Sequence, residues 1–345
     1  MNEGNSGAAP VESTPAYKDR SAGLVIFGIL TLLIGCLAGL FVPLILFGQA
    51  AIAAKNPGAA MPMSAMLPGA LVYAILALVL AWLGIGSILK RRWARALLLI
   101  FSWCWLIMGI LGCISMAFIM PGIMASIPSA GGTPGHPALP PGAASAVLGV
   151  MAVVFGIIFV ILPAIWTFFY ASRHVKATVE ALDPVQRWTD RCPLPVLAVV
   201  LWLAFSVPMM LLMIPAYHGV IAFFGIFLMG APGKLVYLLV AGVWAYAAWA
   251  LYRLDMRGWW VVFILMCLFA ISAVMTFAGH DMTQMYSLMG YPQATLDQLK
   301  NSGFLTGNHL VWLMLGGMVP WLGYLLFIRK YLRPPKELAV LAGPA

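Results

Sequence analysis

The feature that most constrains this chain is a series of long apolar runs without charged side chains. The run LVIFGILTLLIGCLAGLFVPLILF, residues 24–47, has 24 consecutive residues with no Asp, Glu, Lys or Arg. A bilayer core of ~30 Å needs about 20 apolar residues to be crossed by a helix. Hydrophobic residues make up 63% of the chain and charged residues 8%, which excludes a soluble globular domain of this length. We therefore expect an integral membrane protein.

The runs predict helices and not the strands of an outer-membrane barrel. In barrel strands, polar and apolar side chains alternate over stretches of ~10 residues, whereas these runs are apolar throughout. We expect an all-α integral membrane protein with eight transmembrane helices. They are predicted at residues 22–48, 67–89, 95–120, 145–171, 194–215, 235–252, 259–279 and 308–328.

Basic residues are concentrated on one side of the predicted membrane. If successive helices alternate in direction, sixteen of the nineteen Lys and Arg residues lie on the side of the two termini, and only Lys55, Lys234 and Lys300 lie opposite. Basic loops stay in the cytoplasm, so both termini are predicted to be cytoplasmic. The net charge of +9 then sets orientation and favours contact with anionic lipid, while its spread over five segments argues against a nucleic-acid partner. Short loops and an Ala-, Gly- and Pro-rich composition favour a bacterial cytoplasmic membrane.

The order of features along the chain indicates a tandem duplication of a four-helix unit. Equivalent features recur 157 to 166 residues apart. They are KRRWAR at 90–95 with RLDMRGWW at 253–260, LVY at 71–73 with LVY at 235–237, Trp93 with Trp259, Pro43 with Pro208, and Pro163 with Pro320. Because each unit has an even number of spans, both copies would insert in the same orientation, as parallel repeats related by an axis along the membrane normal.

This duplication predicts the organisation of the chain. A flexible cytoplasmic tail at 1–21 precedes a first membrane repeat at 22–171, a cytoplasmic linker at 172–193, a second repeat at 194–333 and a tail at 334–345. The linker is expected to prolong the fourth helix to about Asp183, before Pro184 ends it. The apolar segment at 219–230 is too short to span, so we expect it to lie along the outer surface or to dip into it.

The predicted spans offer little for catalysis or for ion coupling. Ion-coupled transporters and proton pumps keep ionisable groups deep in the membrane, and none is found there in this sequence. Hydroxyls such as those of Ser272 and Thr276 are expected to bond to carbonyls of their own helix. Gly35 and Gly39 have the spacing at which helices pack closely. No known catalytic motif is present, so we do not expect an enzyme.

Histidine and methionine gather on the predicted outer side of the second half. The stretch GHDMTQMYSLMG is expected to form a short helix with Asp281 as its N-cap and Gly290 after its end. Imidazole and thioether ligands together suit copper, particularly Cu(I). The candidate metal ligands are His218, His280, Asp281, Met282, Met285 and His309. The alternative is that these side chains only pack at the membrane interface and that no cofactor is bound.

Three functions remain open from the sequence. The first is a non-enzymatic scaffold or a subunit of a larger membrane complex, with the lipid bilayer, other membrane subunits or a second copy of the chain as partners. The second is a facilitator for an uncharged or apolar solute, which would pass through a cleft between the repeats. The third is metal handling, with copper, at the outer face.

Overall fold

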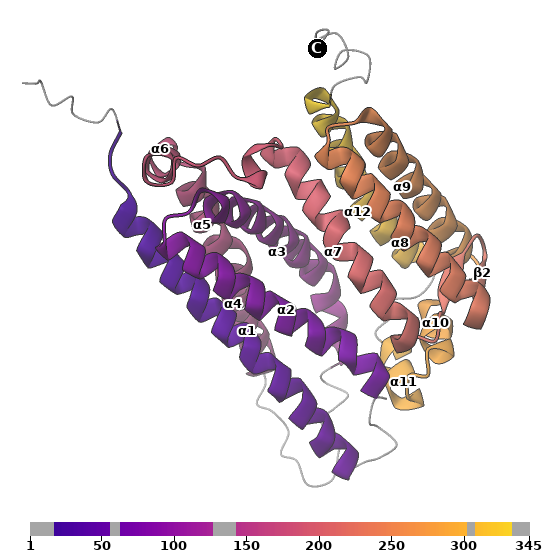
Figure 1. The fold of residues 1–345 in the computed structure, drawn as a ribbon. Coiled ribbons are helices and arrows are strands. Elements are labelled where there is room, and N and C mark those ends of the chain that lie inside the picture. The colour runs from indigo at the N-terminus through magenta and orange to yellow at the C-terminus, as the bar shows by residue number, and fades with distance from the viewer. Residues whose placement is uncertain (1–16, 56–62, 127–142, 302–307, 333–345) are drawn as a thin grey trace, which may run out of the picture.

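The computed structural model describes residues 17–55, 63–126, 143–301 and 308–332. Helices form most of this part of the chain, together with one two-stranded hairpin (Figure 1). The elements are α1 (Ser21–Lys55), α2 (Met63–Ile88), α3 (Arg92–Ser126), α4 (Ala143–Gly156), a π-helical turn (Ile157–Ile161), α5 (Leu162–Ala171), α6 (Arg173–Leu182), a 3-10 turn (Trp188–Asp190), α7 (Leu194–Ala216), β1 (Ile221–Phe223), β2 (Ile226–Leu228), α8 (Gly230–Tyr252), α9 (Met256–Phe277), α10 (Met282–Leu288), α11 (Gln293–Asn301), α12 (Asn308–Ile328) and a 3-10 turn (Arg329–Tyr331). Of the predicted tails, 1–16 and 334–345 lie outside the described residues.

Seven helices in the described part of the chain are long and apolar enough to cross a membrane. They cover Ser21–Lys55, Met66–Ile88, Arg92–Met116, Gly149–Ala171, Leu194–Ala216, Gly230–Tyr252 and Met256–Phe277. The prediction of a multi-pass, helical membrane protein is thereby confirmed. α12 coincides with the eighth predicted span but is not among the seven, since only part of it has described side chains.

The helices run between two ends of an elongated bundle (Figure 1). One end holds the start of α1, the α2–α3 turn, α6, the α8–α9 turn and the end of α12; we call it the basic end. The other holds the hairpin, α10 and α11 and is called the opposite end. The described parts of the segments predicted to be cytoplasmic thus lie at one end, which is the arrangement that alternating helices produce.

Small residues let α1 and α2 approach closely. A methyl group at Gly84 would lie 2.8 Å from the carbonyl oxygen of Gly28, and one at Gly28 would lie 2.9 Å from that of Gly84. Farther along α1, a methyl group at Gly35 would lie 3.1 Å from Cβ of Leu80. In a bilayer the hydrophobic effect does not drive helices together, because lipid tails are as apolar as the side chains. Close backbone contact of this kind supplies van der Waals packing energy instead.

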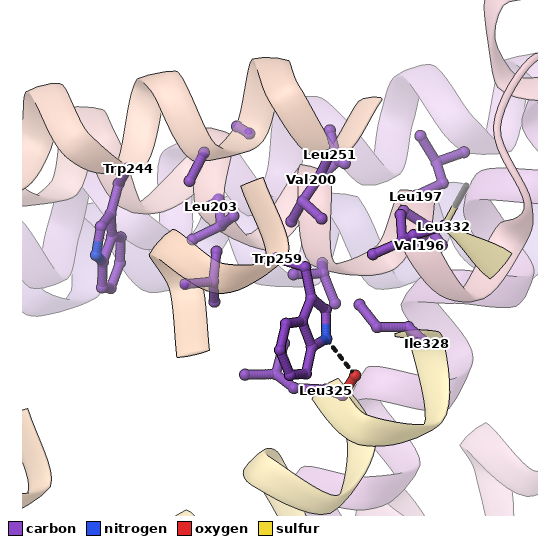
Figure 2. Packing of buried hydrophobic residues seen from close by; sticks show 14 of the residues in the cluster. Val196, Leu197, Val200, Leu203, Trp244, Leu251, Trp259, Leu325, Ile328 and Leu332 are labelled. Atoms are coloured by element: carbon purple, nitrogen blue, oxygen red, sulfur yellow. Dashed lines mark hydrogen bonds between the residues drawn. The ribbon is translucent and has the colours of Figure 1, made fainter. Parts of the chain in front are cut away.

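Large side chains fill the core of the second half (Figure 2). Trp259 of α9 is 1% exposed and lies among leucines and valines of α7, α8 and α12. Its indole N–H donates to the backbone carbonyl of Leu325 at 2.7 Å. A buried indole needs such an acceptor, so this bond fixes α12 against α9.

One segment contradicts the sequence prediction, and two have local structure that the sequence analysis did not specify. α5 does not continue into the linker as predicted: Ser172 has an extended ψ of 136°, and α6 is a separate helix that ends at Leu182. The fourth span contains the π turn at 157–161. The segment at 219–230 forms a β-hairpin, in which Ile221 pairs with Leu228 and Phe223 with Ile226.

Candidate functional site

The first basic turn, between α2 and α3, is built around the carboxylate of Asp183. Lys90 has a left-handed φ of 58°, which ends α2 and turns the chain. The backbone N–H of Arg92 donates to Oδ2 of Asp183 at 3.3 Å. The guanidinium groups of Arg91 and Arg187 lie 3.9 and 3.6 Å from its Oδ1. Asp183 itself is 4% exposed, so its charge is held inside the basic end and balanced there.

Two further carboxylates of the linker complete this network. The guanidinium of Arg92 lies 3.6 Å from both Glu180 and Asp190. Lys176 lies 3.9 Å from Glu180, one turn away on α6. Sequence reasoning assigned this turn to membrane orientation and missed the ion pairs. The available signal was the set of three acidic residues in an otherwise basic linker.

The second basic turn, between α8 and α9, has aromatic rings where the first has carboxylates. Leu254 takes the left-handed conformation, with φ of 60°, and the side chain of Asp255 accepts from the backbone N–H of Arg257. Cations lie over rings in three places nearby. Arg253 is 4.4 Å from the Trp249 centroid, Arg329 is 5.4 Å from that of Trp259, and Lys330 is 4.0 Å from that of Phe327.

An apolar groove of about 470 Å³ runs between α3 and the fourth span. Its walls are side chains of Ile110, Cys113, Ile114, Val153, Gly156, Ile157, Val160 and Ile161. None of the described residues that line it carries a carboxylate, an amine or an imidazole, so it suits an apolar occupant. It lies within the first half, and not between the two halves where a facilitator cleft was predicted.

The π turn beside this groove follows from Pro163. Proline has no N–H to give to the carbonyl four residues earlier, here that of Phe159. The backbone N–H of Leu162 donates to the carbonyl of Ile157, five residues earlier, which is the hydrogen-bond spacing of a π-helix. The freed Phe159 carbonyl lies against Gly109 of α3, where any Cβ would overlap the oxygen. Gly109 is therefore required for α3 to approach the fourth span.

At the opposite end, hydroxyl groups of α9 hold the hairpin. The backbone N–H of Phe224 donates to Oγ of Ser272 at 2.9 Å, and that of Gly225 donates to Oγ1 of Thr276 at 3.0 Å. Thr276 also donates to the carbonyl of Ser272, one turn earlier. The expected bond to its own helix is thus present for Thr276. The bonds to the hairpin were not predicted, because nothing local in the sequence pairs residues 48 to 51 positions apart.

The structure brings the predicted metal ligands to the opposite end but does not assemble a cluster from those it describes. His280 Nδ1 lies 3.2 Å from the carbonyl oxygen of Thr276, and its ring stands edge-on to Phe227. His218 is exposed at the end of α7. α10 begins after Asp281, as expected, and carries Met282 and Met285 half-buried.

No group of three His, Cys, Asp or Glu residues close enough to hold a metal is found among the described residues. His309 lies in the first turn of α12, and its side chain is outside the described set. Metal binding at these positions stays a prediction.

Tyrosines gather beside α10. The rings of Tyr286 and Tyr291 are 4.9 Å apart. Burial, and the neighbouring Tyr217, raise the pKa of Tyr291 to about 12. The phenol of Tyr291 is therefore protonated near pH 7 and can take part in hydrogen bonds without adding negative charge.

Comparisons with known proteins identify no relative. No family model matches the chain, and no curated protein or solved structure is similar to it.

Proposed function

We propose that this protein is a non-enzymatic subunit or scaffold of a membrane complex, and that the fourth span of its first half docks a transmembrane helix of a partner. The observation that carries the proposal is that the described part of the chain covers little of this span. Val150 and Val153 are 65% and 62% exposed, and Ile161 on the wall of the groove is 54% exposed. Only 11% of the span is buried, against 22 to 44% for the other six.

The groove beside that span has the chemistry of a helix-packing surface. Gly156 is open, since a Cβ there would meet nothing within 4 Å, and Cys113 is small. Small residues between larger aliphatic ones admit the ridge of a neighbouring helix. The groove's position within the first half favours this function over a facilitator with a cleft between repeats.

We also propose that the protein has eight spans, arranged as two parallel four-helix repeats. Its main support is that the two basic turns have the same backbone geometry 164 residues apart. α2 ends at Ile88 and α8 at Tyr252; Lys90 and Leu254 have positive φ. The closing bonds correspond too, with Arg91 N–H to Gly86 O at 2.9 Å and Asp255 N–H to Ala250 O at 3.0 Å.

A reciprocal pair of small residues supports the same register. A methyl group at Gly86 would lie 2.7 Å from Cβ of Ala94, where α2 meets α3. A methyl group at Gly258 would lie 2.8 Å from Cβ of Ala250, where α9 meets α8. Glycine and alanine have exchanged places between the two contacts. In this register Trp93 corresponds to Arg257, so the tryptophans matched from the sequence do not take equivalent places.

Orientation and location complete the proposal. The basic end faces the cytoplasm, with both termini, because basic segments are retained there. The membrane is the bacterial cytoplasmic membrane, as the composition favours.

Photocrosslinking in native membranes tests the docking surface. In a background with the five cysteines replaced, Val153→Cys is labelled with a benzophenone maleimide, and Leu239→Cys on α8 serves as the matched control, since the native side chains are 62% and 61% exposed. A discrete protein adduct is expected at 153 and not at 239. Filling the groove with Gly156→Leu should remove the adduct. Lipid adducts alone at both positions would exclude the docking surface.

A further inference from the structure

Four cations at the basic end of the second half have no carboxylate partner in the described part of the chain. Arg253, Arg257, Arg329 and Lys330 are all exposed, and none takes part in an ion pair there. The nearest carboxylate in sequence, Asp255, accepts from the backbone N–H of Arg257 as the N-cap of α9. The first basic turn differs, because its Arg91 and Arg92 are paired with linker carboxylates.

Aromatic rings hold three of these cations at the ends of spans. Trp249, Trp260 and Phe327 are 52%, 46% and 46% exposed, on α8, α9 and α12. In a bilayer such rings lie at headgroup level, and cations above them lie at the same level. The guanidinium of Arg329 is 6.0 Å from the Trp260 centroid. Arg257 is three residues before Trp260, so both lie on the same face of α9.

We propose that the basic end of the second half binds the phosphate of an anionic phospholipid, with Arg257 and Arg329 as the principal contacts. A guanidinium gives a phosphate two parallel hydrogen bonds. The exposed ring beside it offers an apolar surface to the glycerol and upper acyl chain. This combination favours a lipid over a soluble anion, and the inference is independent of the docking surface on the fourth span.

Lipid retention measured by native mass spectrometry tests this site. The full-length protein is released from micelles containing equal amounts of phosphatidylglycerol and phosphatidylcholine. The wild type should retain phosphatidylglycerol preferentially. Arg257→Gln with Arg329→Gln should reduce that preference by about tenfold or more, because each basic residue at a membrane surface raises the affinity for anionic lipid by about fivefold.

The matched control is Arg91→Gln with Arg187→Gln, which removes the same charge from the first basic turn and the linker beside it, where both side chains contact Asp183. It should keep the preference of the wild type. Arg257→Lys with Arg329→Lys keeps the charge and should keep part of the preference, which separates phosphate binding from a folding defect. A wild type without preference, an equal loss in the control, or displacement of the lipid by equimolar inorganic phosphate would overturn the proposal.

Discussion

The two basic turns have the same backbone and opposite surroundings. Each ends a helix with a residue of positive φ, Lys90 or Leu254, and starts the next helix two residues later. Around the first turn, a buried carboxylate accepts a backbone N–H and lies near two guanidinium groups. Around the second, cations lie on indole and phenyl rings. The same turn geometry therefore takes part in a buried ion-pair network in one half and presents an exposed cationic surface in the other.

The linker explains this difference. α6 and the 3-10 turn after it lie over the first half at the basic end and supply Glu180, Asp183 and Asp190 (Figure 1). In the second half, α12 is followed by the 3-10 turn Arg329–Tyr331, which adds cations. The fourth helices also differ: Pro163 accompanies a π turn against Gly109, whereas Pro320 lies inside the regular helix α12.

Gly109→Ala should give the largest loss of stability. It tests a contact that the fourth helix makes in the first half and not in the second. Its Cβ would overlap the Phe159 carbonyl oxygen, so α3 and the fourth span must separate. We expect a loss of about 3 kcal/mol in the free energy of unfolding. Thermal unfolding of the purified protein in detergent measures it. Ala273→Gly, at the corresponding position of α9, is the control and should cost about 1 kcal/mol; equal losses would contradict the asymmetry.

Asp183→Ala should break the first turn more than Asp255→Ala breaks the second. Removal of Asp183 leaves the Arg92 N–H without its acceptor and leaves the guanidinium groups of Arg91 and Arg187 without their shared partner, at a cost of about 2 kcal/mol. Asp255 provides only an N-cap, which is worth about 1 kcal/mol. The midpoints of thermal unfolding compare the two variants, and a larger shift for Asp255→Ala would refute the carboxylate-centred description of the first turn.

Exchange of the small residues tests the common register of the halves. Gly258→Ala should cost about 2 kcal/mol, because its methyl group would lie 2.8 Å from both Cβ of Ala250 and the backbone nitrogen of Leu251. Adding Ala250→Gly relieves only the first of these two clashes, so it should restore only part of the lost stability. In the first half, Ala94→Gly should restore more of the stability lost in Gly86→Ala. The remaining close contact there is with the Trp93 ring, a side chain that can shift, and not with backbone. A double-mutant cycle by thermal unfolding gives both couplings; no coupling in either half would argue against the matched contacts.

Single charges at the two turns should have the smallest effects. Arg91→Gln removes a half-exposed ion pair worth less than about 1 kcal/mol. Arg253→Gln removes an exposed cation–π contact of about 0.5 to 1 kcal/mol. High salt should reduce the effect of Arg91→Gln through screening and change that of Arg253→Gln less. Unfolding at low and high salt compares them, and the reverse order of salt sensitivity would count against the assigned partners.

Local physics accounts for what sequence reasoning predicted correctly. The span at 194–215 was predicted to within one residue and the span at 235–252 to within five, because each apolar run must satisfy its backbone as a helix. The short helix after Asp281 was placed from the residue type at its N-cap position and from the glycine beyond its end, although the structure shows no side-chain cap bond there. The π turn was missed although Pro163 was noted, since the loss of one N–H does not by itself choose between a kink and a wider turn.

The sequence by itself determined a helical membrane protein and concentrated its charges in the segments that lie at one end of the bundle, because hydropathy and charge act on each segment separately. Only the tertiary structure decided that Asp183 meets Arg91 and Arg92, that Ser272 and Thr276 bind the hairpin, and that Gly109 lies on a freed carbonyl. These contacts join residues about 50 to 90 positions apart. They depend on which helices pack together and at what rotation, and uniformly apolar helices carry little of that information in their pattern.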